Sequence, residues 1–151
     1  MPDRNPASNS PPPDQLLQAG RIPVLAVVPM PPDSNPQGNV FGGWIMSQID
    51  IAGAVAAVQR ARGRVSTVAA NTITFLAPIH VGERVLFFAD VVRVGTTSIT
   101  VRVEVFSENR IQAPSPSRTK VSEGTLTYVA LDANGRPRPV DEPPDGQTIR
   151  I

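Results

Sequence analysis

One apolar segment, WIMSQIDIAGAVAAVQ, constrains the fold of this chain more than any other part of the sequence. It lies within a predicted helix of about 20 residues, roughly 30 Å long, that begins near Gly43 and ends near Arg62. Arg60, Arg62 and then Gly63 form a common helix stop signal. The apolar residues lie on several sides of the helix rather than on one stripe, so we expect the helix to be buried. They are Trp44, Ile45, Met46, Ile49, Ile51, Val55 and Val58.

The elements around this helix have the pattern of strands. A short apolar run over residues 22–28 precedes the helix, and four β-branched, often alternating segments follow it. These segments cover residues 64–79, 82–95, 97–107 and 119–132. The order predicts an α+β hotdog fold, in which an antiparallel β-sheet wraps around one long central helix. A single helix leaves apolar surface and a sheet edge uncovered, so we also expect a homodimer.

The two ends of the chain differ in composition from its middle. The 151 residues fit one domain. We expect a disordered, Pro-rich N-terminal tail over residues 1–20, the folded domain over 21–132 and a Pro-rich C-terminal tail over 133–151. The segment 107–118, SENRIQAPSPSR, is expected to be a long, flexible connection between the last two strands.

Composition excludes several functional classes. The chain has no cysteine, which excludes disulfides, thiolate catalysis and Cys-ligated metals. Its one histidine, His80, is expected to be a turn residue and cannot build a multi-His site, so we expect no metal and no cofactor. The net charge of +1 and the lack of a basic run argue against nucleic acid. No segment has the apolar length of a membrane span or a signal peptide, so the expected location is cytoplasmic.

One carboxylate, Asp50, interrupts the apolar helix between Ile49 and Ile51. Taken alone, it is consistent with a structural aspartate that pairs with a loop or faces solvent. The start of the helix favours a second interpretation, because Gly42 and Gly43 leave the backbone N–H groups there unobstructed. These donors and the positive end of the helix dipole could hold a developing oxyanion. Asp50 follows two turns later on roughly the same face, within the predicted reach of a group bound at the helix start.

The segment NPQGNVFGGWIMSQIDIAGAVAA resembles the signature of hotdog acyl-CoA thioesterases, and most closely their bacterial YciA type. The shared pattern is N-x-x-G-x-x-[FH]-G-G followed by an aspartate on the central helix. Three further segments resemble the family's second strand, central hairpin and last strand with its tail: GRVSTVAANTITFLAPIHVGERV, VGTTSITVRVEVF and TYVALDANGRPRPV. The resemblance spans about residues 24–140, nearly the whole predicted domain.

The resemblance implies a role for each residue of the signature. Asp50 takes the place of the catalytic acid, as a nucleophile or as a general base that activates water. Asn35 takes the place of the asparagine that orients water or the thioester, and in the family these two residues come from opposite subunits of a dimer. Gly43, with Gly42, would donate backbone N–H groups to the thioester oxygen. From its sequence context alone, Asn35 before Pro36 is also consistent with a simple turn former.

Three further residues correspond to coenzyme A contacts in the family. Arg64 lies where a basic residue meets the phosphates, and Thr97 and Ser98 lie near the nucleotide portion. Their ordinary structural interpretations are an exposed cation at a helix end and two hairpin residues. The chain departs from relatives at Thr96, where a basic residue is frequent, and at Asn71, where a glutamate is common. Phe41 replaces a frequent histidine, as it does in the YciA type.

The expected activity is the hydrolysis of an acyl-CoA to a free carboxylic acid and coenzyme A, without a metal. An alternative on the same fold is a hydratase or dehydratase of acyl thioesters. Such enzymes resemble one another in pairing a histidine with an aspartate or glutamate at the site, whereas His80, the one histidine here, lies outside the signature. A third interpretation is a protein that binds acyl-CoA without catalysis. The expected assembly is a homodimer, or a hexamer built as a trimer of dimers. The sequence does not set the preferred acyl chain length.

Overall fold

A computed structural model describes residues 20–109 and 117–143 of the chain. The predicted disordered tail, except for its last residue, lies outside this part of the chain. So do residues 110–116 of the predicted connection and residues 144–151 of the Pro-rich C-terminal segment.

The one long helix, α2, runs from Gly42 to Ala61. It ends where Arg62 adopts a left-handed conformation, with φ of 54°, and donates its backbone N–H to the carbonyl of Val58 at 2.8 Å. The predicted helix is therefore confirmed, with each end one residue earlier than expected. A short 3-10 helix, η1 (Pro31–Asp33), lies in the loop before it.

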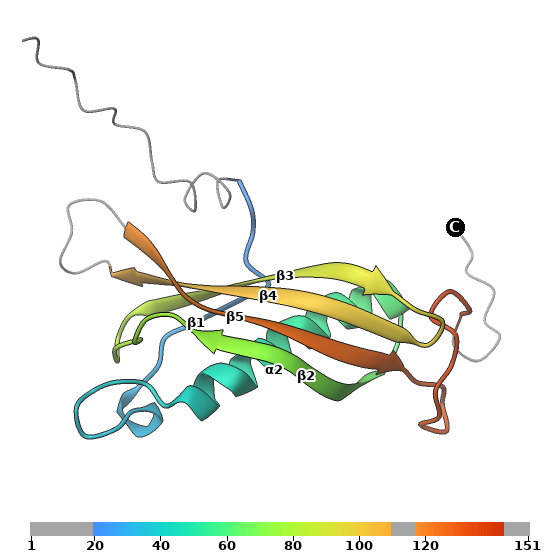
Figure 1. Ribbon diagram of the computed structural model, residues 1–151, viewed down its shortest axis with the longest axis horizontal. Coiled ribbons are helices and arrows are strands. Elements are labelled where there is room, and N and C mark those ends of the chain that lie inside the picture. Colours follow the sequence, from blue (N-terminus) through green and yellow to red (C-terminus); the bar gives the residue numbers. More distant parts are fainter. Residues whose placement is uncertain (1–19, 110–116, 144–151) are drawn as a thin grey trace, which may run out of the picture.

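Within residues 20–109 and 117–143, five strands form a single antiparallel sheet. They are β1 (Leu25–Val27), β2 (Val65–Phe75), β3 (Arg84–Val94), β4 (Ser98–Asn109) and β5 (Ser117–Ala130). Their order across the sheet is β1-β3-β4-β5-β2, so β1 and β2 are the edges and β5 brings the end of the chain beside β2 (Figure 1). The predicted antiparallel sheet with one helix is confirmed, although β1 is shorter than the predicted strand, and β4 and β5 extend further into the predicted connection.

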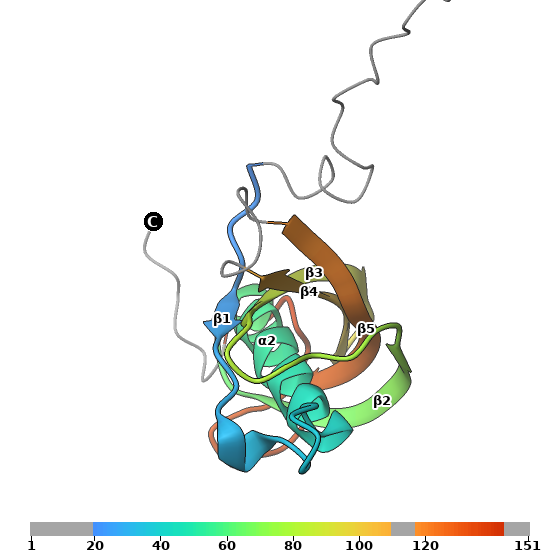
Figure 2. The same cartoon turned by 90° about the vertical axis from the view of Figure 1, so that its left-hand side faces the viewer.

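The sheet curves around α2, which Figure 2 shows nearly end-on inside the curve. Alternate residues of β4 face the helix and are fully buried, which is the period-2 pattern expected of a strand with one buried face. The core between helix and sheet contains Ile45, Ile49, Ala52, Ala57, Val85, Phe87, Ile99, Val101, Val103, Val105, Leu126 and Tyr128.

The opposite side of α2 is open in the single chain. Ile51 and Val58 expose 49% and 42% of their surface there, and Met46, near the helix start, exposes 44%. The expectation that the whole helix is buried is therefore met only in part. The edge strand β2 also exposes apolar side chains, among them Val68 and Phe75. This uncovered apolar surface is the kind that a second subunit covers.

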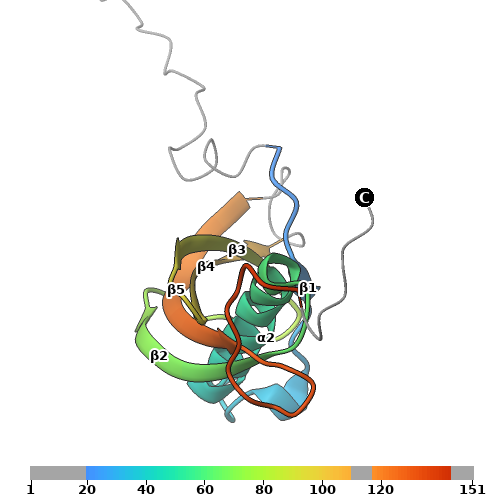
Figure 3. The same ribbon diagram turned by 90° about the vertical axis from the view of Figure 1, so that its right-hand side faces the viewer.

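The residues after β5 fold back against the C-terminal end of α2 (Figure 3). Val140 is part of the core, and the buried guanidinium of Arg138 donates hydrogen bonds to four backbone carbonyls. These belong to Ala61 at 2.7 Å, Leu131 at 3.0 Å, Pro139 at 3.2 Å and Glu142 at 2.7 Å. Arg138 thus satisfies a carbonyl at the helix end that has no partner inside the helix.

Candidate functional site

Asp50 lies near the middle of α2 with a half-buried side chain. Its Oδ1 accepts hydrogen bonds from the Thr67 hydroxyl on β2, at 2.7 Å, and from the Tyr128 hydroxyl on β5, at 3.2 Å. No hydrogen bond between described residues reaches its Oδ2. The carboxylate is therefore held through one oxygen and presents the other, which is the arrangement required of a general base or a nucleophile.

Thr67 and Tyr128 are the residues of this site that sequence reasoning missed. Thr67 had no distinguishing signal, because it is one of several β-branched residues in a strand-like segment. Tyr128 had a weak one: it is the only tyrosine of the chain and lies on the apolar face of its strand, where a hydroxyl needs a partner. Burial first, then the negative charge of Asp50 and the hydrogen bond to it, raise the pKa of Tyr128.

Gly42 and Gly43 form the first turn of α2. The first backbone hydrogen bonds of this turn are donated by Trp44 and Ile45 to Phe41, and among the described residues Gly42 and Gly43 donate none. The side chain of the N-cap residue, Phe41, does not cap the helix either. The N–H groups of the two glycines are therefore free to bind a ligand oxygen.

The two glycines differ in what surrounds them. A Cβ on Gly42 would lie 3.4 Å from the Phe75 ring, in ordinary contact, whereas a Cβ on Gly43 would meet no atom within 4 Å. Neither has a positive φ. Packing inside the single chain thus does not explain why position 43 is glycine.

Asp50 and the start of α2 are separated along the helix axis. Seven residues of helix separate Gly43 from Asp50, about 10 Å at 1.5 Å per residue. The N–H groups at a helix start also point away from the rest of the helix, so a carbonyl bound there lies still further from Asp50. A group bound at the start of the helix would have to span this distance to reach Asp50 of the same chain, so the predicted reach of Asp50 within one chain stays a prediction.

Asn35 lies in the loop before α2 and shapes it. Its side-chain Oδ1 accepts the backbone N–H groups of Gln37, at 3.1 Å, and Asn39, at 3.0 Å. The turn-forming interpretation is therefore correct. Because Oδ1 is occupied, the side-chain NH₂ is the part of Asn35 that can bind another group. His80 pairs with Asn39 in an isolated bridge, and none of the hydrogen bonds between described residues joins it to Asp50.

An apolar cleft of about 380 Å³ opens beside the start of α2. Val40, Ile45 and Gly42 line one side, and Phe75, Leu76 and Pro78, at and beyond the end of β2, line the other. The cleft thus has one wall in common with the free N–H groups of the helix start.

The three residues expected to contact coenzyme A gather at the opposite end of the molecule. The carbonyl of Arg64 accepts the N–H of Leu131, and that of Thr97 accepts the N–H of Ala130, both at 2.9 Å. Ser98, the first residue of β4, is next in the chain. Arg64 is exposed and Thr97 and Ser98 are half-buried, so β5 brings them to one end of the sheet, near the end of α2.

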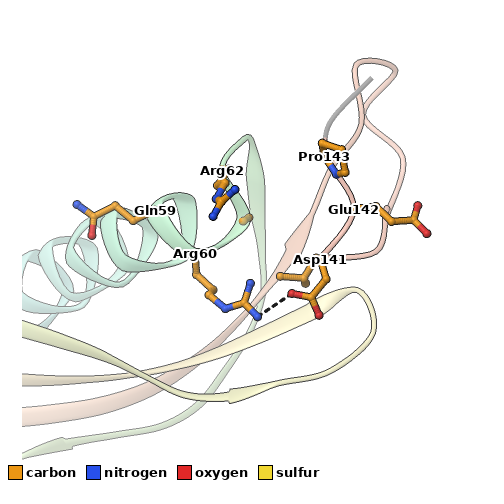
Figure 4. Close-up of a pocket in the computed structure, with 8 residues that line it drawn as sticks. Gln59, Arg60, Arg62, Asp141, Glu142 and Pro143 are labelled. Carbon is orange, nitrogen blue, oxygen red and sulfur yellow. Dashed lines mark hydrogen bonds and ion pairs between the residues drawn. The ribbon is translucent and has the colours of Figure 1, made fainter. Parts of the chain in front are cut away.

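A cavity of about 330 Å³ lies at the same end, between the last turn of α2 and the folded-back C-terminal residues. Figure 4 shows its charged lining: Arg60 is paired with Asp141 at 2.8 Å, and Arg62 and Glu142 complete the charged groups. This cavity was not predicted, because Arg60 and Asp141, on its two walls, are 81 residues apart in the sequence. It lies about 15 Å along the helix from Asp50.

Asn71 makes a side-chain contact within the sheet, whereas the hydrogen bond of Thr96 comes from its main chain and does not explain the threonine. Asn71 lies at an irregularity in the pairing of β2 with β5, where its Oδ1 accepts a hydrogen bond of 2.9 Å from the Thr127 hydroxyl. The Thr96 carbonyl accepts the N–H of Val140.

Among the described residues, no group of His, Cys, Asp or Glu could hold a metal ion. None of the helices described there is long and apolar enough to cross a membrane.

Comparison with known proteins places this site in context. The family model of the Thioesterase superfamily matches residues 37–113. The acyl-CoA thioester hydrolase YciA of Salmonella typhimurium is 45% identical over 117 residues, which are 78% of this chain and 88% of that protein. The hexameric thioesterase y2039 of Yersinia pestis aligns with a TM-score of 0.75 and 42% identity, over 80% of this chain and 96% of that one. Cj0915, a hexameric hotdog fold thioesterase of Campylobacter jejuni, aligns with a TM-score of 0.73 and 41% identity, over 78% of this chain and 88% of that one.

Proposed function

The chain belongs to the thioesterase superfamily, and from this premise we propose that it is an acyl-CoA thioester hydrolase: acyl-CoA and water give a carboxylic acid and free coenzyme A. The observation that carries the proposal is the Asp50 carboxylate, held at Oδ1 by two hydroxyls inside an otherwise apolar helix. The proposal fits the relative named acyl-CoA thioester hydrolase YciA and the hotdog architecture shared with solved thioesterases.

Asp50 is the proposed reactive group. Its free Oδ2 either removes a proton from the attacking water or attacks the thioester carbon itself. In the second route the C–S bond breaks, the coenzyme A thiolate leaves, and water hydrolyses the mixed anhydride that has formed. In both routes negative charge develops on the thioester oxygen. The N–H groups of Gly42 and Gly43 would stabilise that charge. The mechanism uses only side chains, backbone N–H groups and water, so neither a metal nor a cofactor takes part in it.

The complete site requires two subunits. Because Gly43 lies about 10 Å from Asp50 along one helix and its N–H points away, we assign Asn35, Gly42 and Gly43 of one subunit to the same site as Asp50 of a second copy. The exposed apolar side chains of α2 and β2 supply the surface for such a dimer. A hexamer is supported by the two solved relatives, both described as hexameric, and its construction as a trimer of dimers stays a prediction.

The substrate would span the length of the molecule. The apolar cleft between Ile45 and Phe75 is suited to the acyl chain, since it adjoins the free N–H groups. The exposed Arg64, with Thr97 and Ser98, would contact the phosphate and nucleotide portion. Arg62 adds a positive charge at that end of the helix, whereas the charge of Arg60 is paired with Asp141.

The two alternative functions make different demands on the site. A hydratase or dehydratase would place a histidine beside the acid, whereas the hydrogen-bond partners of Asp50 are Thr67 and Tyr128. A protein that only binds acyl-CoA would not need a carboxylate with one oxygen held and one free.

The expected cytoplasmic location stays a prediction, which fractionation of cells that produce the protein would test.

One experiment tests the proposed function. Free thiol is measured after incubating the purified protein with acyl-CoA esters from short to long chain. The unaltered protein should release thiol, and Asp50→Asn should lower the rate by about a hundredfold or more, the order expected for an acid–base group. The variant should keep its fold, because asparagine has the same shape. The absence of thiol release from every ester would refute the function, and an active Asp50→Asn variant would refute the mechanism.

A further inference from the structure

Tyr128 reaches Asp50 from β5, across the core of the domain. Its side chain is fully buried, and its hydroxyl lies 2.8 Å from the main-chain oxygen of Asp50 and 3.2 Å from Oδ1 of the same residue. Both oxygens are acceptors, so the single O–H of the phenol is shared between them, with the main-chain oxygen as the nearer acceptor. One hydroxyl therefore ties the carboxylate to the backbone of its own helix.

Gly53 provides the space for this contact. It is buried in α2, and a Cβ added there would overlap the Tyr128 hydroxyl oxygen and lie 3.0 Å from the Tyr128 Cζ. Alanine is the better helix former at an interior position, so glycine here is not explained by helix propensity. The phenol of Tyr128 explains the glycine, because any larger residue at position 53 would occupy the space of its hydroxyl.

The two hydroxyls around Asp50 act on the same oxygen. Thr67 and Tyr128 both bind Oδ1, from different strands and with different burial: Thr67 is exposed, whereas Tyr128 is closed off from solvent. In the single chain Thr67 can exchange its hydrogen bond with water, but Tyr128 has no solvent to exchange with. The buried phenol is thus the more constant of the two restraints on the carboxylate.

We propose that Tyr128 is a positioning residue for thioester hydrolysis, which holds the Asp50 carboxylate so that Oδ2 faces the reacting centre, and that Gly53 is required because it admits the phenol. This inference rests on the proposed function of Asp50. It gives Tyr128 no contact with the substrate, so its effect passes entirely through Asp50. Because burial and the charge of Asp50 raise the pKa of the phenol, Tyr128 stays protonated and remains a donor.

The first test is Tyr128→Phe, which removes the hydroxyl and keeps the ring. We expect kcat to fall about tenfold or more, the order of one hydrogen bond to a charged group, with KM unchanged. The matched control is Ser122→Ala, which removes another fully buried β5 hydroxyl that donates to a carbonyl, that of Thr74, at 2.7 Å. This control should keep the wild-type kcat. A wild-type kcat for folded Tyr128→Phe would overturn the inference.

Two double variants separate positioning from mere packing. In the Asp50→Asn background, Tyr128→Phe should lower the residual rate no further, whereas a packing role would lower it again. Gly53→Ala should lower kcat in the tyrosine protein and have much less effect in Tyr128→Phe, where the overlapping oxygen is gone. Equal effects of Gly53→Ala in both backgrounds would overturn the coupling, even if Tyr128→Phe alone folds poorly. The wild-type protein is assayed alongside the variants. If the proposed function is wrong, the wild type will release no thiol from any ester, and this result is distinct from a failure of the inference about Tyr128.

Discussion

The Thr67 hydroxyl on β2 donates a hydrogen bond of 2.7 Å to Oδ1 of Asp50 on α2. It joins the central helix to the edge strand of the sheet, on the side where a second subunit is proposed to dock. The bond orients the acid and the strand relative to one another. A change at Thr67 is therefore expected to alter catalysis more than stability, because its side chain is exposed.

Thr67→Val tests this relationship, since valine keeps the shape and removes the donor. We expect kcat to fall about tenfold, as for a lost hydrogen bond to a charged group, with little change in the melting temperature. Thr127→Val is the matched control, because the Thr127 hydroxyl bonds Asn71 and not Asp50. Similar losses of kcat in both variants would indicate a general disturbance of the sheet.

Gly43→Ala distinguishes a ligand-binding glycine from a structural one. A Cβ at this position meets no atom within 4 Å in the single chain, so thermal unfolding should show an unchanged or slightly higher melting temperature. If a thioester oxygen must approach the Gly43 N–H, the added methyl group should nevertheless lower kcat/KM by about tenfold or more. A stable variant with full activity would remove Gly43 from the proposed oxyanion hole.

Arg138 should be one of the most sensitive residues for stability outside the helix and sheet. Arg138→Met would leave four backbone carbonyls without this donor, including that of Ala61 at the helix end. We expect urea unfolding to show a loss of about 2–4 kcal/mol in the free energy of unfolding. The exposed Arg136, replaced in the same way, should change it by less than about 0.5 kcal/mol. Equal effects would mean that the guanidinium of Arg138 contributes little.

Glu108 should make stability depend on acid pH. Burial alone would raise its pKa, but hydrogen bonds and charge from Arg118 and Arg84 outweigh it and hold the pKa below the ordinary value of 4.5. A depressed pKa contributes stability above pH 4.5, and this contribution is lost as the pH falls through the folded-state pKa. Unfolding at pH 7 and pH 3 should therefore differ more for the wild type than for Glu108→Gln. An equal pH dependence in the two proteins would contradict the assignment.

The long helix and the strands could be predicted from the sequence because the pattern of apolar residues differs between them. The long apolar segment predicted the helix, and alternating apolar residues predicted strands such as residues 98–109. The sequence also pointed to Asp50, since an acid inside an apolar helix is conspicuous. It did not point to Thr67 and pointed only weakly to Tyr128, whose contact with Asp50 depends on the place of β5 in the sheet. It also gave no sign of Arg138, whose buried role is set by the fold-back of a Pro-rich segment. The roles of Arg64, Thr97 and Ser98 stay predictions.

The strongest test of a site shared between subunits combines Asn35→Asp with Asp50→Asn. Asn35→Asp keeps an oxygen to accept the N–H groups of Gln37 and Asn39, so the loop is preserved, but it removes the NH₂ donor. Each homodimer then has two damaged sites. A heterodimer of the two variants has both changes in one site and neither in the other, provided that each site takes Asn35 from one subunit and Asp50 from its partner.

Mixing the two inactive variants under conditions of subunit exchange should therefore restore activity. Random exchange makes about half of the dimers heterodimers, each with one intact site of two, so recovery should approach about a quarter of the wild-type rate. Native mass spectrometry verifies the exchange, and a mixture of Asp50→Asn with Asp50→Ala is the control, which should recover nothing. If exchange is complete and the first mixture also stays inactive, Asn35 and Asp50 do not meet across the interface. The separation of about 10 Å between Gly43 and Asp50 along one helix would then have to be bridged within a single subunit.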